Sequence, residues 1–245
     1  MAMKLDRNGA ALSASFEGLF LYSYPDPGTG GEPITCGLGH TAAAGGIKPL
    51  MGQAFTMRQV MDMFRGDMGR VENSVNKAIH VPLGQPQFNV CCSFQLNTGA
   101  IATGSFDDKL NAGDQTAALA VLGQYTRAAG RVMQGLVNRR RMEIAIFKTG
   151  EYPSMKIEVR DRPDSPVRYI SADALPWDAP EPPLVDLHIA PLPTAAVPVP
   201  PIPPKSTPAT SPAPTPKPAI PPLPTLGRQN FIIDIYRYFV GLFRK

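Results

Sequence analysis

The sequence predicts an α+β fold, in which a small β lobe is inserted into a larger α-helical lobe, followed by a proline-rich linker and a C-terminal amphipathic helix. Apolar residues recur at helical spacing through much of the first 155 residues. Seven glycines between Gly28 and Gly46 interrupt this pattern with short apolar or β-branched pieces, which suits small strands and tight turns. Of the 28 prolines, 19 fall between Pro176 and Pro224, a density that helices and sheet interiors exclude. We therefore expect a folded domain over 1–155, an irregular segment and linker over 156–227, and a helix over 228–245.

The first helix is expected near the N-terminus, where apolar residues are close to helical spacing from Leu5 to Phe20. The segment from Tyr24 to Gly28 holds two prolines and a glycine and must turn, so the helix should end just beyond Glu17. The glycine-rich segment that follows is the expected β lobe, and functional residues often lie in such loops.

A longer helix should begin at Thr56–Gln59, which has the capping-box pattern, and continue to about Ala78. Three further helices are expected, of which the second is capped by Asp114 and the last is ended by Gly150. They cover about 86–96, 114–125 and 136–148.

Beyond the helical lobe the composition changes. Residues 156–175 are mixed and charged, and we expect them to wrap the body as irregular chain. Residues 176–224 are a low-complexity mixture of Pro, Ala, Thr and Lys that favours polyproline II. At about 3.1 Å per residue this segment is a semi-stiff spacer that reaches on the order of 150 Å.

Residues 228–245 are expected to form an amphipathic helix, because polar or small residues recur at spacings of three or four and leave large apolar residues on the opposite face. The segment holds four basic side chains and one acidic side chain, a charge of +3. About fifteen helical residues span about 22 Å, short of the roughly 30 Å of a bilayer's hydrocarbon core, so this helix should lie on a surface. A membrane surface, a partner protein and the chain's own body are the alternatives.

Charge and composition exclude several classes of function. The net charge is +4, but the first 155 residues hold 14 basic and 12 acidic side chains without a basic stripe among aromatics, so nucleic acid is not an expected partner. There is no run of 18 apolar residues, and Met1–Glu17 lacks the apolar core of a secretory signal, so we expect the chain to be made and kept in a cytoplasm. Cys36, Cys91 and Cys92 are expected as buried, reduced thiols. No histidine stands at metal-ligand spacing from them, so neither a metal nor a cofactor is expected.

Three residues near the N-terminus are candidates for catalysis. Glu17 stands at the expected helix end, Asp26 lies in the following turn, and Thr35 begins the short segment that ends at Thr41. Two carboxylates and a hydroxyl that face one cleft suit general acid and base catalysis. A Glu and an Asp nine residues apart are a weak signal alone, because solvated surface carboxylates are the rule.

The residues around this set are more specific. Phe16-Glu17-Gly18-Leu19, Tyr24-Pro25-Asp26 and Thr35-Cys36-Gly37-Leu38-Gly39-His40-Thr41 strongly resemble the phage-type lysozymes, glycoside hydrolase family 24, which include phage endolysins. Further motifs resemble the same family in the same order, at 85–89, 93–99, 109–114 and 135–141. The resemblance covers about residues 5–152 and implies a lysozyme-like fold.

The resemblance implies cleavage of the β-1,4 bond between N-acetylmuramic acid and N-acetylglucosamine in peptidoglycan. Glu17 would be the general acid, and Asp26 and Thr35 would hold and activate the attacking water. This is the inverting arrangement, which needs carboxyl groups about 6.5–9.5 Å apart. Arg139 matches a family arginine that pairs with the catalytic glutamate, and we expect it to position Glu17.

The resemblance also implies weaker assignments. Phe94 and Gln95 match positions that line the saccharide cleft in relatives, with core packing as the alternative for Phe94. His40 is expected to be structural. Two of the three arginines over 139–141 are expected on a solvated basic face that attracts the anionic wall.

Three hypotheses for the whole chain follow. The first is an endolysin, made in the host cytoplasm and acting on the periplasmic cell wall, whose residues 228–245 contact an anionic membrane surface. The second is a virion lysozyme that the same segment ties to a phage structural protein. The third is a non-catalytic structural tail protein with a lysozyme fold. Because Glu17, Asp26 and Thr35 are all present, an active enzyme is favoured.

Overall fold

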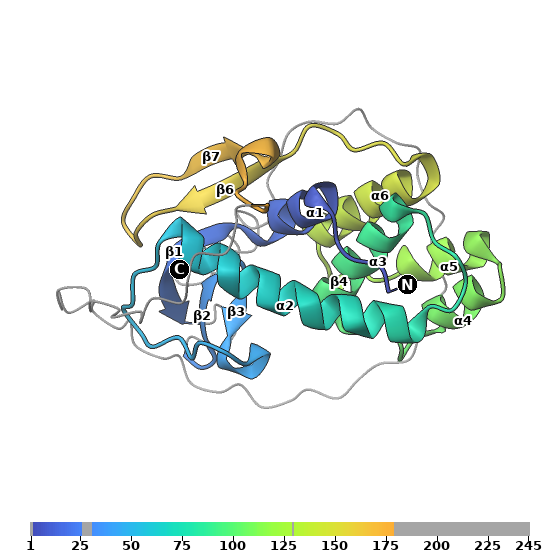
Figure 1. Cartoon of the computed structure of the whole chain (residues 1–245), viewed down its shortest axis with the longest axis horizontal. Helices are drawn as coiled ribbons and strands as arrows, with labels where there is room; N and C mark the ends of the chain where they lie inside the picture. Colours follow the sequence, from blue (N-terminus) through green and yellow to red (C-terminus); the bar gives the residue numbers. More distant parts are fainter. Residues whose placement is uncertain (1, 26–30, 129, 179–245) are drawn as a thin grey trace. The chain divides into compact units, whose positions relative to one another are not determined.

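The computed structural model describes residues 2–25, 31–128 and 130–178 of the chain (Figure 1). Within them the fold is α+β, as predicted: strands gather near the start of the long helix α2 (Met57–Ala78), and short helices lie near its end. In this part of the chain no helix is both long and apolar enough to span a bilayer. The predicted linker beyond residue 178 and the predicted helix over 228–245 lie outside the described residues.

Helix α1 (Arg7–Glu17) places the predicted acid at its last position. Asp6 caps the N-terminus, because its side chain accepts the Gly9 amide at 2.9 Å. Most of the buried residues of α1 are small (glycine, alanine or serine), which allows it to pack closely on α3 (Gln85–Thr98). The helix ends as predicted because Gly18 has a φ of 68°, a conformation that favours glycine.

Strand β1 (Leu19–Pro25) is the central strand of a five-stranded sheet of order β3-β2-β1-β6-β7. On one side it pairs antiparallel with β2 (Ile34–Gly37), which pairs with β3 (His40–Thr41). On the other side it pairs parallel with β6 (Lys156–Arg160), which pairs antiparallel with β7 (Arg168–Ser171). The predicted β lobe therefore supplies three strands, β1 to β3, of a larger five-stranded sheet (Figure 1).

The prediction of irregular chain over 156–175 is wrong, and so is the domain boundary at 155. Ile157 and Val159 are fully buried in β6 and alternate with charged residues, which is the period of a strand, but five residues are a short run on which to predict one. Pairing with β1 joins segments about 140 residues apart, so no local signal announces it. The described part of the folded body reaches at least to Asp178, whose carboxylate pairs with Arg7 at 2.7 Å.

The other helices form the second lobe. Helix α2 begins at the predicted capping box, in which Thr56 Oγ1 accepts the Gln59 amide at 3.2 Å and Gln59 Oε1 accepts the Thr56 amide at 2.7 Å. Asp114 caps α5, and Gly150 ends the last helix in the left-handed region, both as predicted. The remaining elements are α4 (Ser105–Asn111), α5 (Gln115–Leu122), α6 (Gln134–Thr149), the hairpin of β4 (Arg127–Ala128) and β5 (Arg131–Val132), and the 3-10 turns Ala42–Ala44 and Ala172–Ala174.

Helix α3 is enclosed by α1, α2 and α6, which pack around it. Seven consecutive residues, Phe88 to Phe94, are buried. They include the free thiols of Cys91 and Cys92, and the free thiol of Cys36 is buried in β2. Burial raises the pKa of all three thiols, that of Cys36 to about 12. These are the unreactive core cysteines that the sequence predicted.

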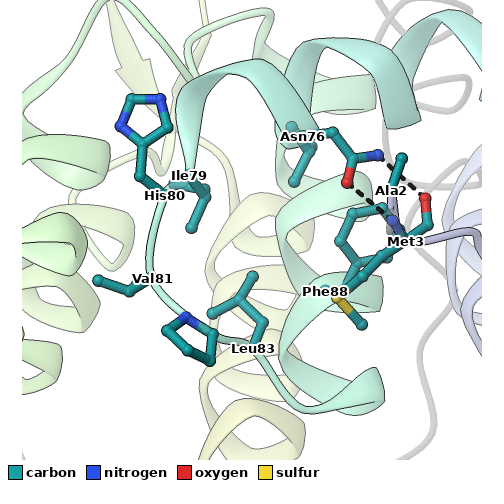
Figure 2. A pocket seen from close by; sticks show the side chains of 10 residues that line it. Ala2, Met3, Asn76, Ile79, His80, Val81, Leu83 and Phe88 are labelled. Atoms are coloured by element: carbon teal, nitrogen blue, oxygen red, sulfur yellow. Dashed lines mark hydrogen bonds between the residues drawn. The ribbon is translucent and has the colours of Figure 1, made fainter.

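The N-terminal segment is tied to α2 by polar contacts. Asn76 accepts the Met3 amide and donates to the Met3 carbonyl, both at 2.9 Å (Figure 2). One turn earlier, the buried carboxylate of Glu72 accepts Lys4 Nζ and the Leu5 amide, both at 2.8 Å. Glu72 is therefore a buried acid whose contacts fix the course of the chain.

A cavity of about 480 Å³ opens beside this anchor, between the end of α2 and the loop that leads to α3 (Figure 2). Ile79, Val81, Leu83 and Phe88 line it together with residues of the N-terminal segment. No predicted site residue is among its walls, so the candidate site is elsewhere.

Candidate active site

Glu17 lies where the two lobes approach each other. Its side chain is 23% exposed, and Oε1 accepts a hydrogen bond from Arg139 Nη1 at 2.7 Å, from the helical lobe. The other oxygen, Oε2, faces the turn between β2 and β3, where a Cβ added to Gly39 would come within 3.7 Å of it. Gly39 has a φ of 84°, so the turn itself requires glycine. The carboxyl group is thus held on one side and partly open on the other.

Arg139 is fully buried, and contacts on every side fix its guanidinium. In addition to the bond from Nη1 to Glu17, the Nε of Arg139 donates to Glu143 Oε1 at 3.2 Å. Its Nη2 donates to the carbonyl and the hydroxyl of Ser93, at 2.9 and 3.2 Å. The ring of Phe16 lies 4.8 Å from the guanidinium carbon, a cation–π contact. Three helices, α1, α3 and α6, therefore aim this arginine at Glu17.

Glu143 lies behind Arg139 and has no exposed surface. Its Oε1 accepts the Ser93 hydroxyl at 2.7 Å and Arg140 Nη2 at 2.9 Å, and its Oε2 lies 2.7 Å from Arg140 Nε. Burial lowers the pKa of Arg140, and the adjacent Glu143 carboxylate opposes that effect. Two arginines and one glutamate are thus buried together beneath the candidate acid.

Of the other two predicted catalytic residues, the structure describes Thr35 but not Asp26. Thr35 lies in β2, opposite Tyr24 of β1 and Thr41 of β3. Its side chain is largely buried, and its hydroxyl donates to the Pro33 carbonyl at 3.4 Å. Asp26 lies outside the described residues. The structure therefore brings Glu17 and Arg139 together, and the roles of Thr35 and Asp26 stay predictions.

His40 joins the β lobe to α2 and is not free for catalysis. Its Nε2 donates to the Ile47 carbonyl at 2.8 Å, and its Nδ1 lies 2.9 Å from an Asp67 carboxylate oxygen. Both partners only accept hydrogen bonds, so the ring satisfies both as the doubly protonated imidazolium. The hydrogen bond to Asp67 raises the pKa of His40, with burial acting against it. Across the described ranges no three His, Cys, Asp or Glu side chains gather so as to hold a metal ion.

Comparison with known proteins identifies the family. The phage lysozyme family model matches residues 14–143, more than half of the 245 residues. The chain belongs to the phage lysozyme family. The match contains Glu17, Thr35 and Arg139, and it covers β1 to β5, α2 to α5 and parts of α1 and α6.

Relatives include proteins called endolysins. The chain is 37% identical over 150 residues to the endolysin of Bacillus phage PZA, which covers 60% of this chain and 56% of that protein. It is 32% identical over 148 residues to the endolysin of Salmonella phage P22, and this match covers 59% of this chain and 98% of that protein. A solved structure, the endolysin from Escherichia coli O157:H7 phage FAHEc1, aligns with a TM-score of 0.56 at 30% identity and covers 62% of this chain and 98% of that one. The chain thus spans just over half the length of the Bacillus phage protein.

The structure corrects the assignment of Phe94 in this lysozyme-family chain. Phe94 has no exposed surface, and its ring packs 5.2 Å from Phe106 and 4.9 Å from Tyr125 between centroids. The guanidinium of Arg140 lies 5.4 Å from the same ring. Phe94 is therefore a core residue that supports the buried arginine, and no face of it is open to a sugar.

Gln95 differs from its neighbour because it is only half-buried. Its side-chain oxygen accepts the Ile101 amide at 2.9 Å and so holds the loop between α3 and α4. This bond fixes the orientation of the amide group. Contact with substrate through its nitrogen stays a prediction.

The expectation for the three consecutive arginines is also wrong. Arg139 and Arg140 are buried, and only Arg141 is exposed. The reason is Glu143, four and three residues beyond the two buried arginines. That spacing was visible, but i,i+3 and i,i+4 ion pairs usually lie on helix surfaces, so the sequence alone favoured a solvated face.

Proposed function

We propose that this chain is a peptidoglycan hydrolase, a muramidase that cleaves the β-1,4 bond between N-acetylmuramic acid and N-acetylglucosamine, and that it serves as a phage endolysin. One observation carries the proposal. A partly exposed carboxyl, Glu17, is held at 2.7 Å by a fully buried arginine at the point where the lobes of a phage lysozyme fold approach each other.

In this proposal Glu17 donates its proton to the oxygen of the bond that breaks. Oε1 is fixed by Arg139, so the proton sits on the Oε2 side, which faces the β2–β3 turn. Fixing one oxygen removes rotational freedom that the acid would otherwise lose when it aligns with the sugar.

The finer proposal is that Asp26 and Thr35 hold and activate the attacking water on the opposite face of the sugar. An ionised carboxylate as base with a hydroxyl as second partner suits an inverting reaction, which leaves room for a water between acid and base. The donor of Thr35 now contacts the Pro33 carbonyl at 3.4 Å, a long bond that a water could replace. We also propose that the Gln95 amide nitrogen meets a substrate hydroxyl.

The biological setting is part of the same proposal. The enzyme would be made in the host cytoplasm and act on the periplasmic cell wall, with peptidoglycan as its substrate. Residues 228–245 would contact an anionic membrane surface, with a phage structural protein as the alternative partner in a virion lysozyme. Mass spectrometry of purified virions distinguishes the two, because an endolysin is absent from the particle.

The test of the chemistry is release of reducing ends from purified peptidoglycan. Glu17→Gln and Asp26→Asn should each abolish the release while far-UV circular dichroism stays that of the wild type. Glu72→Gln is the matched control, because Glu72 is also a glutamate with hydrogen-bonded oxygens but lies at the N-terminal anchor. Wild-type turnover by Glu17→Gln or Asp26→Asn would refute the role of that residue.

The inverting mechanism has its own measurement. Proton NMR of the first products from a soluble chitooligosaccharide or peptidoglycan fragment should show the α-anomer at the new reducing end, because inversion converts a β-bond. A β-anomer formed first would refute the assignment of Asp26 as a base that activates water.

A further inference from the structure

We propose that Glu143 is a positioning residue for the candidate acid: it fixes Arg139 so that Nη1 meets Glu17, and with Arg140 it sets the net charge beneath that carboxyl. The inference rests on the proposed role of Glu17 as general acid. Glu143 itself touches neither substrate nor Glu17; it acts through Arg139.

The geometry of the guanidinium is the first argument. Nε and Nη2 form one edge of the planar fork, and Glu143 and Ser93 occupy that edge at 2.9–3.2 Å. Nη1 lies on the other side of the group and meets Glu17 at 2.7 Å. Ser93 in turn donates to Glu143 at 2.7 Å, so the two residues that hold the edge are bonded to each other. With that edge occupied, the guanidinium cannot turn about its own plane without breaking these bonds, and Nη1 stays beside Glu17.

Stability alone does not explain these buried charges. A buried ion pair costs desolvation energy, and apolar residues of similar volume often stabilise a core as well or better. An i,i+4 pair on a helix surface avoids that cost and stabilises by tenths of a kilocalorie. Here Arg139, Arg140 and Glu143 are each at most 1% exposed. These three charged residues lie behind the proposed catalytic carboxyl, and positioning that carboxyl is a reason for burying them that stability does not provide.

The charge balance is the second argument. Among the described residues, the charged groups of α6 that face Glu17 are Arg139 in contact and Arg140 behind it, and the field of Glu17 reaches Arg140. From α3 the neutral Ser93 meets Arg139 behind the carboxyl, and from the β lobe Gly39 faces Glu17 Oε2. The adjacent His40 is bonded to Asp67 of α2. Two arginines and Glu143 sum to +1, which Glu17 neutralises once it has given up its proton.

Opposite changes in this net charge should shift the midpoint of the Glu17 titration in opposite directions. Glu143→Gln removes a negative charge, so the midpoint at which Glu17 loses its proton should fall by about half to one pH unit. Arg140→Gln removes a positive charge, so the midpoint should rise by a similar amount. The double variant Arg140→Gln/Glu143→Gln should return it close to the wild-type value.

The experiment is a pH titration of the Glu17 carboxyl by ¹³C NMR in the full-length chain, with the signal assigned by its loss in Glu17→Gln. Glu72→Gln is the control, because it removes a buried carboxylate bonded to the N-terminal segment and should leave the midpoint unchanged. This readout does not depend on turnover. If Glu143→Gln does not fold, Arg140→Gln and the double variant still give the opposite-shift test.

Activity supplies the second measurement. The rate falls about tenfold per pH unit once the acid is deprotonated, so a shift of half to one unit in Glu143→Gln should cost about three- to tenfold on the alkaline limb of the pH profile. Glu143→Asp keeps the charge and should restore the midpoint. Unchanged midpoints in both charge variants, or shifts of the same sign, would overturn the inference. An inactive wild type whose midpoints move as expected would refute the proposed function and leave the positioning role supported.

Discussion

Replacing Arg139 by glutamine is the most direct test of the buried cluster. The change removes the donor to Glu17, leaves the Ser93 carbonyl without its charged partner, and leaves Glu143 with Arg140 alone. Breaking a buried ion pair by removing one partner costs about 3–5 kcal/mol, because the remaining charge is uncompensated. For a folded body of this size each kilocalorie lowers Tm by roughly 2–4 °C, so Tm should fall by roughly 6–20 °C.

Urea unfolding followed by far-UV circular dichroism measures this loss, with Arg141→Gln as the matched control. Arg141 is on the same helix turn but exposed, so its replacement should change the unfolding free energy by less than about 0.5 kcal/mol. Arg139→Gln should also lose activity at a temperature where it is fully folded, because Glu17 is no longer fixed. If the two variants differ in stability by less than about 1 kcal/mol, the claim that Arg139 is a buried, multiply bonded residue is wrong.

Three further predictions address individual corrections and contacts. Phe94→Ala should destabilise the protein by about 3–5 kcal/mol, as expected for a fully buried ring, with KM unchanged at a temperature where the variant is folded; a raised KM at unchanged stability would restore a substrate-binding role. Ile157→Asp should destabilise by a comparable amount, because it places a charge in the buried face of β6, and wild-type urea unfolding would return the domain boundary to 155. His40→Gln should cost about 1–2 kcal/mol near pH 5.5 and much less near pH 9. The reason is that the raised pKa of His40 gives stability that is fully present below about pH 6.5 and is lost as pH rises through the folded-state pKa; an equal cost at both pH values would contradict the imidazolium pair with Asp67.

Local signals predicted the elements they belong to. The Thr56–Gln59 capping box, the Asp114 cap and the glycine after α6 each mark a boundary through atoms a few residues apart, and the structure has all three. Helix α4 was not predicted because seven residues are too few for a periodic pattern and Gly104 provides no side-chain cap. Strands β6 and β7 were not predicted for a different reason. β6 is stabilised by pairing with β1, a strand about 140 residues earlier, and no local pattern indicates that pairing.

In the candidate site, too, contacts between distant residues could not be predicted from local sequence. The pairing of Glu17 with Arg139 came from the family resemblance, because nothing in the local sequence joins residues 122 positions apart. Phe94 was assigned to the saccharide cleft because phenylalanine is common both in protein cores and in sugar-binding sites. Only its burial in the structure distinguishes the two. Glu143 was overlooked because its spacing from two arginines is typical of exposed helix pairs. What the sequence lacks in each case is which face of α3 or α6 the fold encloses.

The enclosure of this cluster has a consequence for how the acid works. In the proposed reaction Glu17 holds a proton at the start, and Arg139, Arg140 and Glu143 beside it sum to a charge of +1. As the proton moves to the sugar oxygen, negative charge develops on Glu17 and the cluster becomes neutral, so the arrangement stabilises the later state more than the earlier one. That difference is what lowers a barrier, and because the guanidinium is already fixed, no reorganisation is needed when the charge appears. Arg139 and Arg140 without Glu143 would sum to a charge of +2 and would favour the ionised form of the proposed acid more strongly. On this proposal the buried glutamate moderates the positive charge of the two arginines, although burying it costs desolvation energy.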